Sequence, residues 1–437
     1  MQTRYAVLGL ARPRAKWFGD IGRWASSGAT PIDFVRCVGA EEVKARLAGG
    51  RPFSAVLVDG SLPAADRDLF AVARDAGCAP FVVDGTTGRD WTSLGAAAVL
   101  PGDLSADQLL AALETHATGL ADVVAYAGTA TRPVHGDARR WSGRLVTVTG
   151  PGGTGASLVA MGLAQHHGDD PRHAGHVLLA DLALRADQAL LHGSPDVVPG
   201  VSELAEAHRT GQPDPGAVRA SCFDIEGRGY QLLLGLRRPR DWAALRPSAT
   251  AAMFDSLLGT YRQVVADVTA DVEGESDTGS VDVEERNSLA RLACARASVV
   301  VVVGLPGLKG LHSLRRVVAE LAGHGVPADR LVTVLNRAPR SPRLRAELVR
   351  TCHEVLVDTS GAPLVAGPPV FVGRYRNVET ALRAAHRIPD QLGGIVAGAV
   401  EAVAARAGAA GPAPAEPVAI RPGSLGLAGD DLEQRAG

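Results

Sequence analysis

Arg144-Leu-Val-Thr-Val-Thr-Gly-Pro-Gly-Gly-Thr-Gly-Ala-Ser157 is the most informative segment of this chain. A β-branched run ends at Gly150, a glycine-rich turn follows, and an apolar pattern of helical period begins at Ser157. A phosphate-binding loop requires this order of strand, loop and helix, because the glycines let backbone N–H groups face inward and the helix N-terminus points at the same spot. The Ser157 hydroxyl stands where such a loop places its Mg²⁺ ligand. The position before it, where such a loop carries a lysine, is Ala156.

Composition and charge narrow the class of protein. The 437 residues are 46% hydrophobic and 21% charged, which is ordinary for a globular protein of two or three domains. The net charge of −2 argues against a polyanion-binding surface over the whole chain. The five cysteines form no Cys-x-x-Cys pair, which favours reduced thiols. We find no signal peptide, and no apolar run approaches the ~20 residues of a membrane span, so we expect a cytoplasmic protein.

Residues 1–118 alternate short apolar segments with amphipathic ones, which predicts a doubly wound parallel α/β sheet. Ser105 is a suitable N-cap for the last predicted helix. The order and size resemble the receiver domain of response regulators, which has a flavodoxin-like fold. The expected strands are 5–10, 33–38, 54–59, 80–84 and 96–100, and the expected helices are 17–26, 41–47, 64–76 and 106–116.

The receiver resemblance places Asp59 at the position of the phosphoacceptor. A receiver also needs an acidic pair after its first strand and a lysine after its fifth, but this chain has Leu8–Pro13 and Leu100-Pro101-Gly102 there. A carboxylate without metal or counter-cation has little to activate it, so we favour a strand-end residue over a phosphorylation site. The domain is expected to be an atypical receiver used for docking or dimerisation.

Residues 119–142 lack sustained periodicity, which predicts a linker, and residues 406–437 are low in complexity, which predicts a disordered tail. Between them, 143–405 is expected to form a second α/β domain. Two of its apolar strands end in an acid, Asp181 and Asp267. The expected strands after the glycine-rich loop are 176–181, 261–267, 297–304, 331–337 and 370–372, and a final helix is expected around 391–405.

The order of glycine-rich loop, Asp181, Asp267 and Asn336-Arg337 resembles the MinD/ParA family of deviant Walker ATPases, which have a P-loop α/β fold. With a receiver-like domain in front, the chain resembles the CpaE/TadZ branch of that family, which places pilus or secretion machinery, and related actinobacterial septum-site factors. The likeness spans nearly the whole chain except the linker and the tail. No single motif is decisive, but their order over ~200 residues is hard to obtain by chance.

The resemblance implies the roles of individual residues. Asp181 would be the catalytic residue near the attacking water, Asp267 would hold Mg²⁺ through water, and Asn336 would face the adenine of ATP. The phosphate cradle, with Ser157 as a Mg²⁺ ligand, would be formed by Gly152, Gly153, Thr154, Gly155 and Ser157.

Three positions depart from the family pattern. The lysine that reaches across a dimer to the partner's nucleotide falls on Pro151, the P-loop lysine falls on Ala156, and the second switch acid falls on Ala183. A charged hydrogen bond contributes roughly 1.5–3 kcal/mol, so losing both lysines removes on the order of two to four decades of phosphate affinity. Arg185 or Lys309 could substitute, but nothing in the sequence places either there. ATP and Mg²⁺ remain the implied ligands, bound weakly or not at all, and hydrolysis is expected to be weak or absent.

Two charged stretches have competing interpretations. The acids between Asp271 and Glu285 lack the spacing of a metal-binding loop and favour a solvated acidic loop. The arginines between Arg228 and Arg246 are either a weak DNA contact or the rim of a strand end, and we favour the rim. The tail segment Asp430–Arg435 has too few apolar residues for a membrane-binding helix, so no direct membrane insertion is expected.

These features together predict a degenerate MinD/ParA-type protein that acts as a spatial adaptor for a pilus or secretion apparatus. The competing expectation is an active ATPase switch in chromosome partitioning or septum-site placement. We expect a homodimer whose partners are proteins of the apparatus. Recruitment of the cytoplasmic protein to a pole, septum or membrane would then come through those partners.

Overall fold

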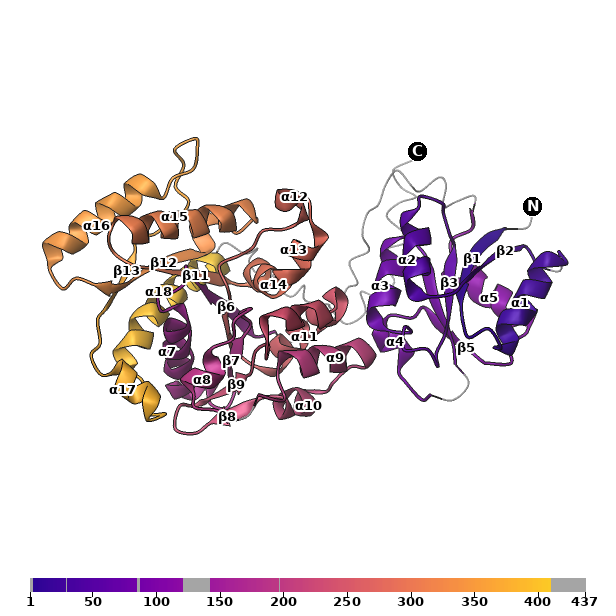
Figure 1. Cartoon of the computed structure of the whole chain (residues 1–437), viewed down its shortest axis with the longest axis horizontal. Helices are drawn as coiled ribbons and strands as arrows, with labels where there is room; N and C mark the ends of the chain where they lie inside the picture. Colours follow the sequence, from indigo (N-terminus) through magenta and orange to yellow (C-terminus); the bar gives the residue numbers. More distant parts are fainter. Residues whose placement is uncertain (1–2, 29, 85–86, 121–141, 196, 410–437) are drawn as a thin grey trace, which may run out of the picture.

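The computed structural model describes residues 3–28, 30–84, 87–120, 142–195 and 197–409, which form two α/β domains with separate sheets (Figure 1). Most of the predicted linker, 121–141, and most of the predicted tail, 410–437, lie outside the described residues. The tail segment considered for membrane binding lies there as well. None of the helices in the described ranges is long and apolar enough to cross a membrane.

The N-terminal domain is a five-stranded parallel sheet in the order β2-β1-β3-β4-β5, which confirms the flavodoxin-like expectation. Alternate residues of each strand enter two apolar clusters, one on each face, as expected for a sheet covered on both sides. The strands are β1 Tyr5–Leu10, β2 Ile32–Cys37, β3 Ala55–Asp59, β4 Ala79–Val83 and β5 Ala98–Leu100.

The helices of this domain match the expected segments, and one was missed. Ser105 caps α5 as predicted, since its hydroxyl accepts from Gln108 N while the Gln108 side chain accepts from Ser105 N. The missed helix, α4, has only four residues, too few to show a periodic pattern. The helices are α1 Lys16–Ser26, α2 Ala40–Ala48, α3 Arg67–Asp75, α4 Trp91–Leu94 and α5 Ala106–His116.

The second domain is an eight-stranded sheet in the order β13-β12-β11-β6-β10-β7-β9-β8, with the P-loop strand β6 near its centre. All neighbours are parallel except β8, which pairs antiparallel with β9 at the edge and was not predicted. The strands are β6 Arg144–Thr149, β7 Val177–Asp181, β8 Phe223–Ile225, β9 Tyr230–Leu233, β10 Gln263–Asp267, β11 Val299–Gly304, β12 Leu331–Ala338 and β13 Val370–Gly373.

Helices cover both faces of this sheet (Figure 1). α7 and α18 pack on one face, while α9, α11, α14 and α15 cover the other. The final helix α18 was predicted and extends a few residues further than expected. The helices are α7 Ala156–Asp169, α8 Gln188–Leu191, α9 Val201–Thr210, α10 Pro215–Ala220, α11 Pro247–Thr260, α12 Glu275–Thr278, α13 Val281–Arg286, α14 Ser288–Arg296, α15 Leu308–Gly323, α16 Pro342–Val355, α17 Val378–Arg383 and α18 Asp390–Ala409.

Helix α3 of the N-terminal domain packs against α9 and α11 of the P-loop domain. The Arg67 guanidinium donates to two main-chain carbonyls at the C-terminal end of α9, at 2.9 and 3.2 Å. Arg209 of α9 pairs with Asp66 at 2.8 Å, and the Ser248 amide of α11 donates to Asp68 at 2.8 Å. The two domains are therefore joined by directed polar contacts within the described residues.

Candidate functional site

The loop between β6 and α7 has the conformation of a phosphate-binding loop. A Cβ on Gly150, the residue that follows β6, would lie 2.3 Å from the Val303 carbonyl oxygen, so only glycine fits at this position. Gly155 has φ +88°, and a Cβ there would lie 2.6 Å from Asn336 Nδ2. This left-handed residue turns the chain into α7, whose first amide groups have no intrahelical acceptor and face the loop.

Two residues brace this loop from within the protein. Thr154 is buried, and its hydroxyl donates to the Pro151 carbonyl at 2.8 Å. The Asn336 side chain donates to the Thr154 carbonyl at 2.8 Å and accepts from the Arg337 amide at 2.8 Å. Asn336, which the family resemblance assigned to adenine, therefore ties the end of β12 to the loop. It also lines a cavity beside the loop.

The two predicted acids lie side by side at the carboxyl ends of adjacent strands. Asp267 of β10 is in register with Asp181 of β7, and their exposed fractions are 2% and 0%. Gln188, the first residue of α8, bridges them: its amide donates to Asp181 at 2.9 Å and its side-chain Nε2 donates to Asp267 at 2.7 Å. The same Nε2 lies 3.1 Å from the Ser157 carbonyl oxygen. The structure thus brings Ser157, Asp181 and Asp267 together through Gln188.

Burial sets the ionisation of this acidic pair. Desolvation, and then the neighbouring Asp267 carboxylate, raise the pKa of Asp181 well above its ordinary value. Desolvation also raises the pKa of Asp267, although hydrogen bonds from Gln188 and Ser157 oppose that shift. Two carboxylates this close and this buried resist ionising together, so the pair retains a proton more readily than exposed acids do.

The residues at the site fit a hard cation better than they fit the phosphates of ATP. The Ser157 hydroxyl and the Asp267 carboxylate are in contact, and the Gln188 Oε1 atom is buried without a hydrogen-bond partner among the described residues. Oxygen donors of this kind suit Mg²⁺. Lysine, by contrast, is missing from the loop itself, where Pro151 and Ala156 stand in its place.

The two candidate substitutes for the missing lysines are both on the surface. Arg185 lies in the loop after Asp181 and is exposed, and Lys309 is exposed in the first turn of α15. Neither side chain has a hydrogen bond or ion pair within the part of the chain that the structure describes. Ala183, at the position of the second switch acid, is buried, and its amide donates to Asp181 at 3.4 Å.

Sequence reasoning missed Gln188 and the polar chain behind it. The Gln188 carbonyl contacts His192 Nδ1 at 2.7 Å, and His192 Nε2 lies 2.7 Å from the Tyr230 hydroxyl. Burial lowers the pKa of His192 to about 4, so this imidazole is neutral. Gln188 stands seven residues after Asp181 and directly after Asp187, and no local sequence pattern marks it as a bridging residue.

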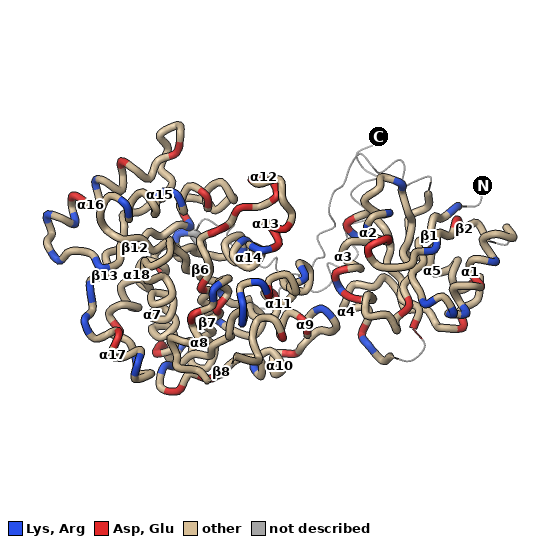
Figure 2. Tube along the Cα trace, viewed as in Figure 1, with Lys and Arg blue, Asp and Glu red and all other residues tan. Residues whose placement is uncertain are grey.

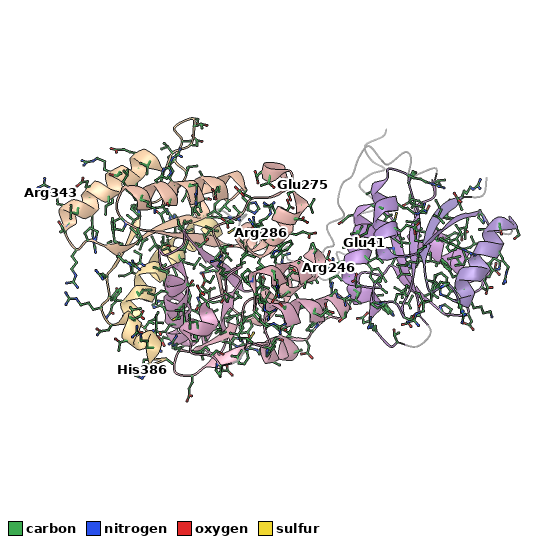
Figure 3. The ribbon with its side chains drawn as sticks, viewed as in Figure 1. Glu41, Arg246, Glu275, Arg286, Arg343 and His386 are labelled. Carbon is green, nitrogen blue, oxygen red and sulfur yellow. The ribbon has the colours of Figure 1, made fainter. Side chains whose placement is uncertain are left out.

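The arginines between Arg228 and Arg246 do not form one basic surface. Arg228 is 1% exposed, and its guanidinium donates to the His386 carbonyl at 2.7 Å, which leaves it unavailable to a DNA backbone. Arg237 pairs with Glu203 at 3.1 Å. Arg246 directly precedes α11, on the side toward the N-terminal domain (Figure 3). The pKa of Glu41 is lowered mainly by Lys44, and Arg246 adds to that lowering.

Asp59 lies at the end of β3, as predicted, and its carboxylate accepts from the Ser61 amide at 2.9 Å. Asp84, which follows β4, accepts from the Trp91 indole at 2.6 Å. In the segment after β1, where a receiver holds its metal, the sequence supplies no acid. Asp59 thus lies at the expected position, in surroundings that add neither a second acid after β1 nor a lysine after β5.

The acidic stretch from Asp271 to Glu285 forms the short helices α12 and α13 and the turns beside them. Its carboxylates cap local backbone amides: Asp277 accepts from the Gly274 amide, and Glu284 from the Glu275 amide, both at 2.9 Å. No group of histidine, cysteine and acidic side chains suited to a metal ion occurs among the described residues.

Comparison with known proteins finds similarity in fold only. No family model and no curated protein match the chain. Among solved structures, a ParA family ATPase from Chlorobium tepidum is 15% identical, covering 59% of this chain and 98% of that one at a TM-score of 0.46. A putative plasmid partition protein from Borrelia burgdorferi bound to AMPPNP is 11% identical, covering 61% and 99% at a TM-score of 0.42. The septum site-determining protein MinD of Pyrococcus horikoshii, complexed with Mg-ADP, is 19% identical, covering 60% and 95% at a TM-score of 0.40.

Proposed function

We propose that this chain is a degenerate MinD/ParA-type nucleotide-binding protein that acts as a spatial or assembly adaptor for a pilus or secretion apparatus, in the manner of the CpaE/TadZ branch. The observation that carries the proposal is a phosphate-binding loop with the right backbone and no lysine. Gly155 and Thr154 keep the loop in shape, while Pro151 and Ala156 supply no positive charge. Such a loop can hold a ligand but does little to stabilise the charge that develops during phosphoryl transfer.

The state of the acidic pair supports the same conclusion. Burial raises the pKa of both Asp181 and Asp267, so the pair retains a proton readily, and Gln188 donates a hydrogen bond to each acid. Both effects reduce the need for a cation at this position. Asp181 accepts from the Gln188 and Ala183 amides, so part of its acceptor capacity is already used within the protein. The acids therefore have hydrogen-bond partners within the protein, in keeping with a site that does not hydrolyse ATP.

ATP and Mg²⁺ are the ligands proposed for this site, with weak affinity. Ser157 and Asp267 would hold the metal, and the amide groups of Gly153 and Gly155 and of the first turn of α7 would face the phosphates. When bound, Mg²⁺ supplies positive charge to the phosphate oxygens. The protein's own contribution is limited to backbone dipoles and the Ser157 hydroxyl.

The second candidate function is an active ATPase switch in chromosome partitioning or septum-site placement. It is favoured by the retention of Ser157, Asp181 and Asp267 in one cluster and by the unpartnered Gln188 Oε1. Such a switch would need a cation at the transferring phosphate, and the exposed Arg185 would have to move to supply it.

Phosphate release from ATP with Mg²⁺ by the purified full-length chain separates the two candidates. The adaptor proposal expects turnover at the background rate, unchanged in Ser157→Ala. Turnover well above background that is abolished in Ser157→Ala would establish the switch and overturn the adaptor proposal.

The adaptor role has its own experiment in cells. The fluorescently tagged chain and its Ser157→Ala variant would be followed with and without the genes of the apparatus. We expect both forms to gather at a pole, septum or membrane site only when the apparatus is present, because protein partners hold the chain there. Equal placement in cells without the apparatus would contradict the proposal.

A further inference from the structure

Two cavities meet beside the phosphate-binding loop, at the carboxyl ends of β12 and β13. One has a volume of about 770 Å³ and includes Gly155 and Asn336 in its wall, and the other has a volume of about 810 Å³. Arg374, Tyr375 and Arg376, which follow β13, line both cavities. The shared residues make the two cavities neighbours, and we call them together the depression beside the loop. Each volume is in the range of small-molecule sites.

The wall of this depression carries four arginines. Arg337 lines the first cavity, Arg340 lines the second, and Arg374 and Arg376 line both. All four are exposed, and none of their guanidinium groups has a hydrogen bond or ion pair within the described ranges of the chain. The acid in the wall, Glu379, is already paired with Arg383 of α17 at 3.0 Å. Figure 2 shows the same gathering of basic residues along the edge that carries β13 and α17.

The backbone positions one of these arginines in an unusual way. Arg337 has φ +55°, in the left-handed region that residues other than glycine rarely adopt. It lies in a register shift between Leu335 and Ala338, where β12 loses its regular pairing with β13. The Asn336 side chain accepts from the Arg337 amide and holds this conformation. The bulge places the arginine in the cavity wall.

The charge in this site is distributed opposite to what a nucleoside triphosphate needs. ATP bound as the family resemblance implies would place its phosphates at Pro151 and Ala156, which have no charge. Its neutral base, at Asn336, would lie beside the three arginines of the first cavity. Cations that lack a partner are best compensated by an anion, and guanidinium groups bind phosphate oxygens in pairs. The half-buried Tyr375 ring offers a face on which a base can stack.

We propose that this depression binds a nucleotide that carries phosphates at two separated positions, one on the loop amides and the other on the arginines around Tyr375. The chemistry is shared by nucleoside 3′,5′-polyphosphates and by dinucleotides. The inference rests on the proposed nucleotide-binding role of the loop and not on the adaptor role.

The test is calorimetric titration of the full-length chain at fixed salt with four probes: ATP, guanosine 3′,5′-bis(diphosphate), cyclic di-GMP and a short single-stranded oligonucleotide. We expect guanosine 3′,5′-bis(diphosphate) or cyclic di-GMP to bind about tenfold or more tightly than ATP, and whichever binds identifies the source. Binding of ATP as tightly as either would overturn the inference.

A matched pair of variants locates the site. Arg374→Ala with Arg376→Ala should weaken binding of the preferred probe by about tenfold or more. The control, Arg330→Ala with Arg350→Ala, removes the same charge from exposed positions outside the depression. This control should change the affinity for the preferred probe by less than about twofold. Equal loss in both double variants, or tighter binding of the oligonucleotide, would show a general polyanion surface and refute the site. Phosphate release, measured separately, reports on the adaptor proposal alone.

Discussion

Gln188 donates hydrogen bonds to two buried acids whose oxygens would otherwise need water or a metal ion as their partners. Its amide donates to Asp181 and its side chain donates to Asp267, and these bonds favour the ionised form that burial disfavours. One residue thereby makes the strand ends stable without a ligand. The remaining cost is electrostatic, because each carboxylate raises the energy of ionising the other.

Asp181→Asn is expected to increase the free energy of unfolding at neutral pH. Since the pKa of Asp181 is raised in the folded state, the folded chain binds more protons than the unfolded chain between the two pKa values, and stability falls as pH rises through that window. Asparagine removes this penalty. We expect a gain near pH 7.5 that shrinks as pH is lowered toward about 4, measured by urea denaturation at several pH values.

The control for this prediction is Asp214→Asn, at the exposed N-cap of α10, where asparagine caps as well as aspartate. It should leave stability unchanged to within a few tenths of a kcal/mol across the same pH range. A loss of stability in Asp181→Asn near pH 7.5 would contradict this prediction.

Ala156→Lys is expected to raise the affinity for ATP and Mg²⁺ by about tenfold, because one charged hydrogen bond is added to a loop that already has the required backbone. Ala156 is the first residue of α7 and is partly exposed, so a lysine can extend toward the loop. Calorimetry on the wild type, Ala156→Lys and the uncharged control Ala156→Met would measure the effect. An unchanged affinity in Ala156→Lys would mean that the loop does not receive phosphate.

Among the elements, the segment from β6 to α7 depends most on its glycines. Gly155→Ala should lower the free energy of unfolding by about 1–3 kcal/mol, because φ is +88° and the new Cβ would meet Asn336 Nδ2. Gly152→Ala is the matched control, since a Cβ there meets nothing within 4 Å and the residue does not have a positive φ. Thermal denaturation of the two variants should therefore give unequal shifts, and equal shifts would argue against the observed loop conformation.

Most of the strands could be predicted from sequence because parallel strands are buried on both faces and appear as continuous apolar runs. Val299–Gly304 and Val177–Asp181 are such runs, and both strands form as expected. The edge strand β8 has only three residues and no run of that kind. It could be recognised only from its pairing with β9, which sequence pattern does not report.

Sequence motifs point to three residues of the candidate site but not to the contacts that surround them. Ser157, Asp181 and Asp267 follow from a loop pattern and two strand ends, and the sheet brings them together. The bridge by Gln188 depends on how α8 folds back over the strand ends, and the arginine-lined depression depends on a register shift in β12. Neither has a local sequence signal, because each arises from contacts between segments far apart in the chain.

For the whole molecule, we expect the oligomeric state to be independent of ATP and Mg²⁺. A ligand shifts an equilibrium only by its differential affinity for the two states. Under the proposed MinD/ParA resemblance, Pro151 stands where a lysine would couple a bound nucleotide to a second copy. Light scattering of the full-length chain with and without ATP and Mg²⁺ should give the same mass. A monomer that becomes a dimer only with ATP would support the active ATPase switch over the adaptor.

Deletion of residues 1–118 should weaken any dimer.

The contact between α3 and α9 also has an evolutionary consequence. Arg67 donates to the main-chain carbonyls of His208 and Gly211, and any residue supplies a carbonyl, so these two bonds do not depend on the identity of the side chains there. Arg67 itself cannot drift in this way, and Asp66 and Arg209 can change only together. Selection would therefore act unevenly across this boundary, preserving Arg67 and the Asp66–Arg209 pair while the two carbonyl bonds make no demand on side-chain identity.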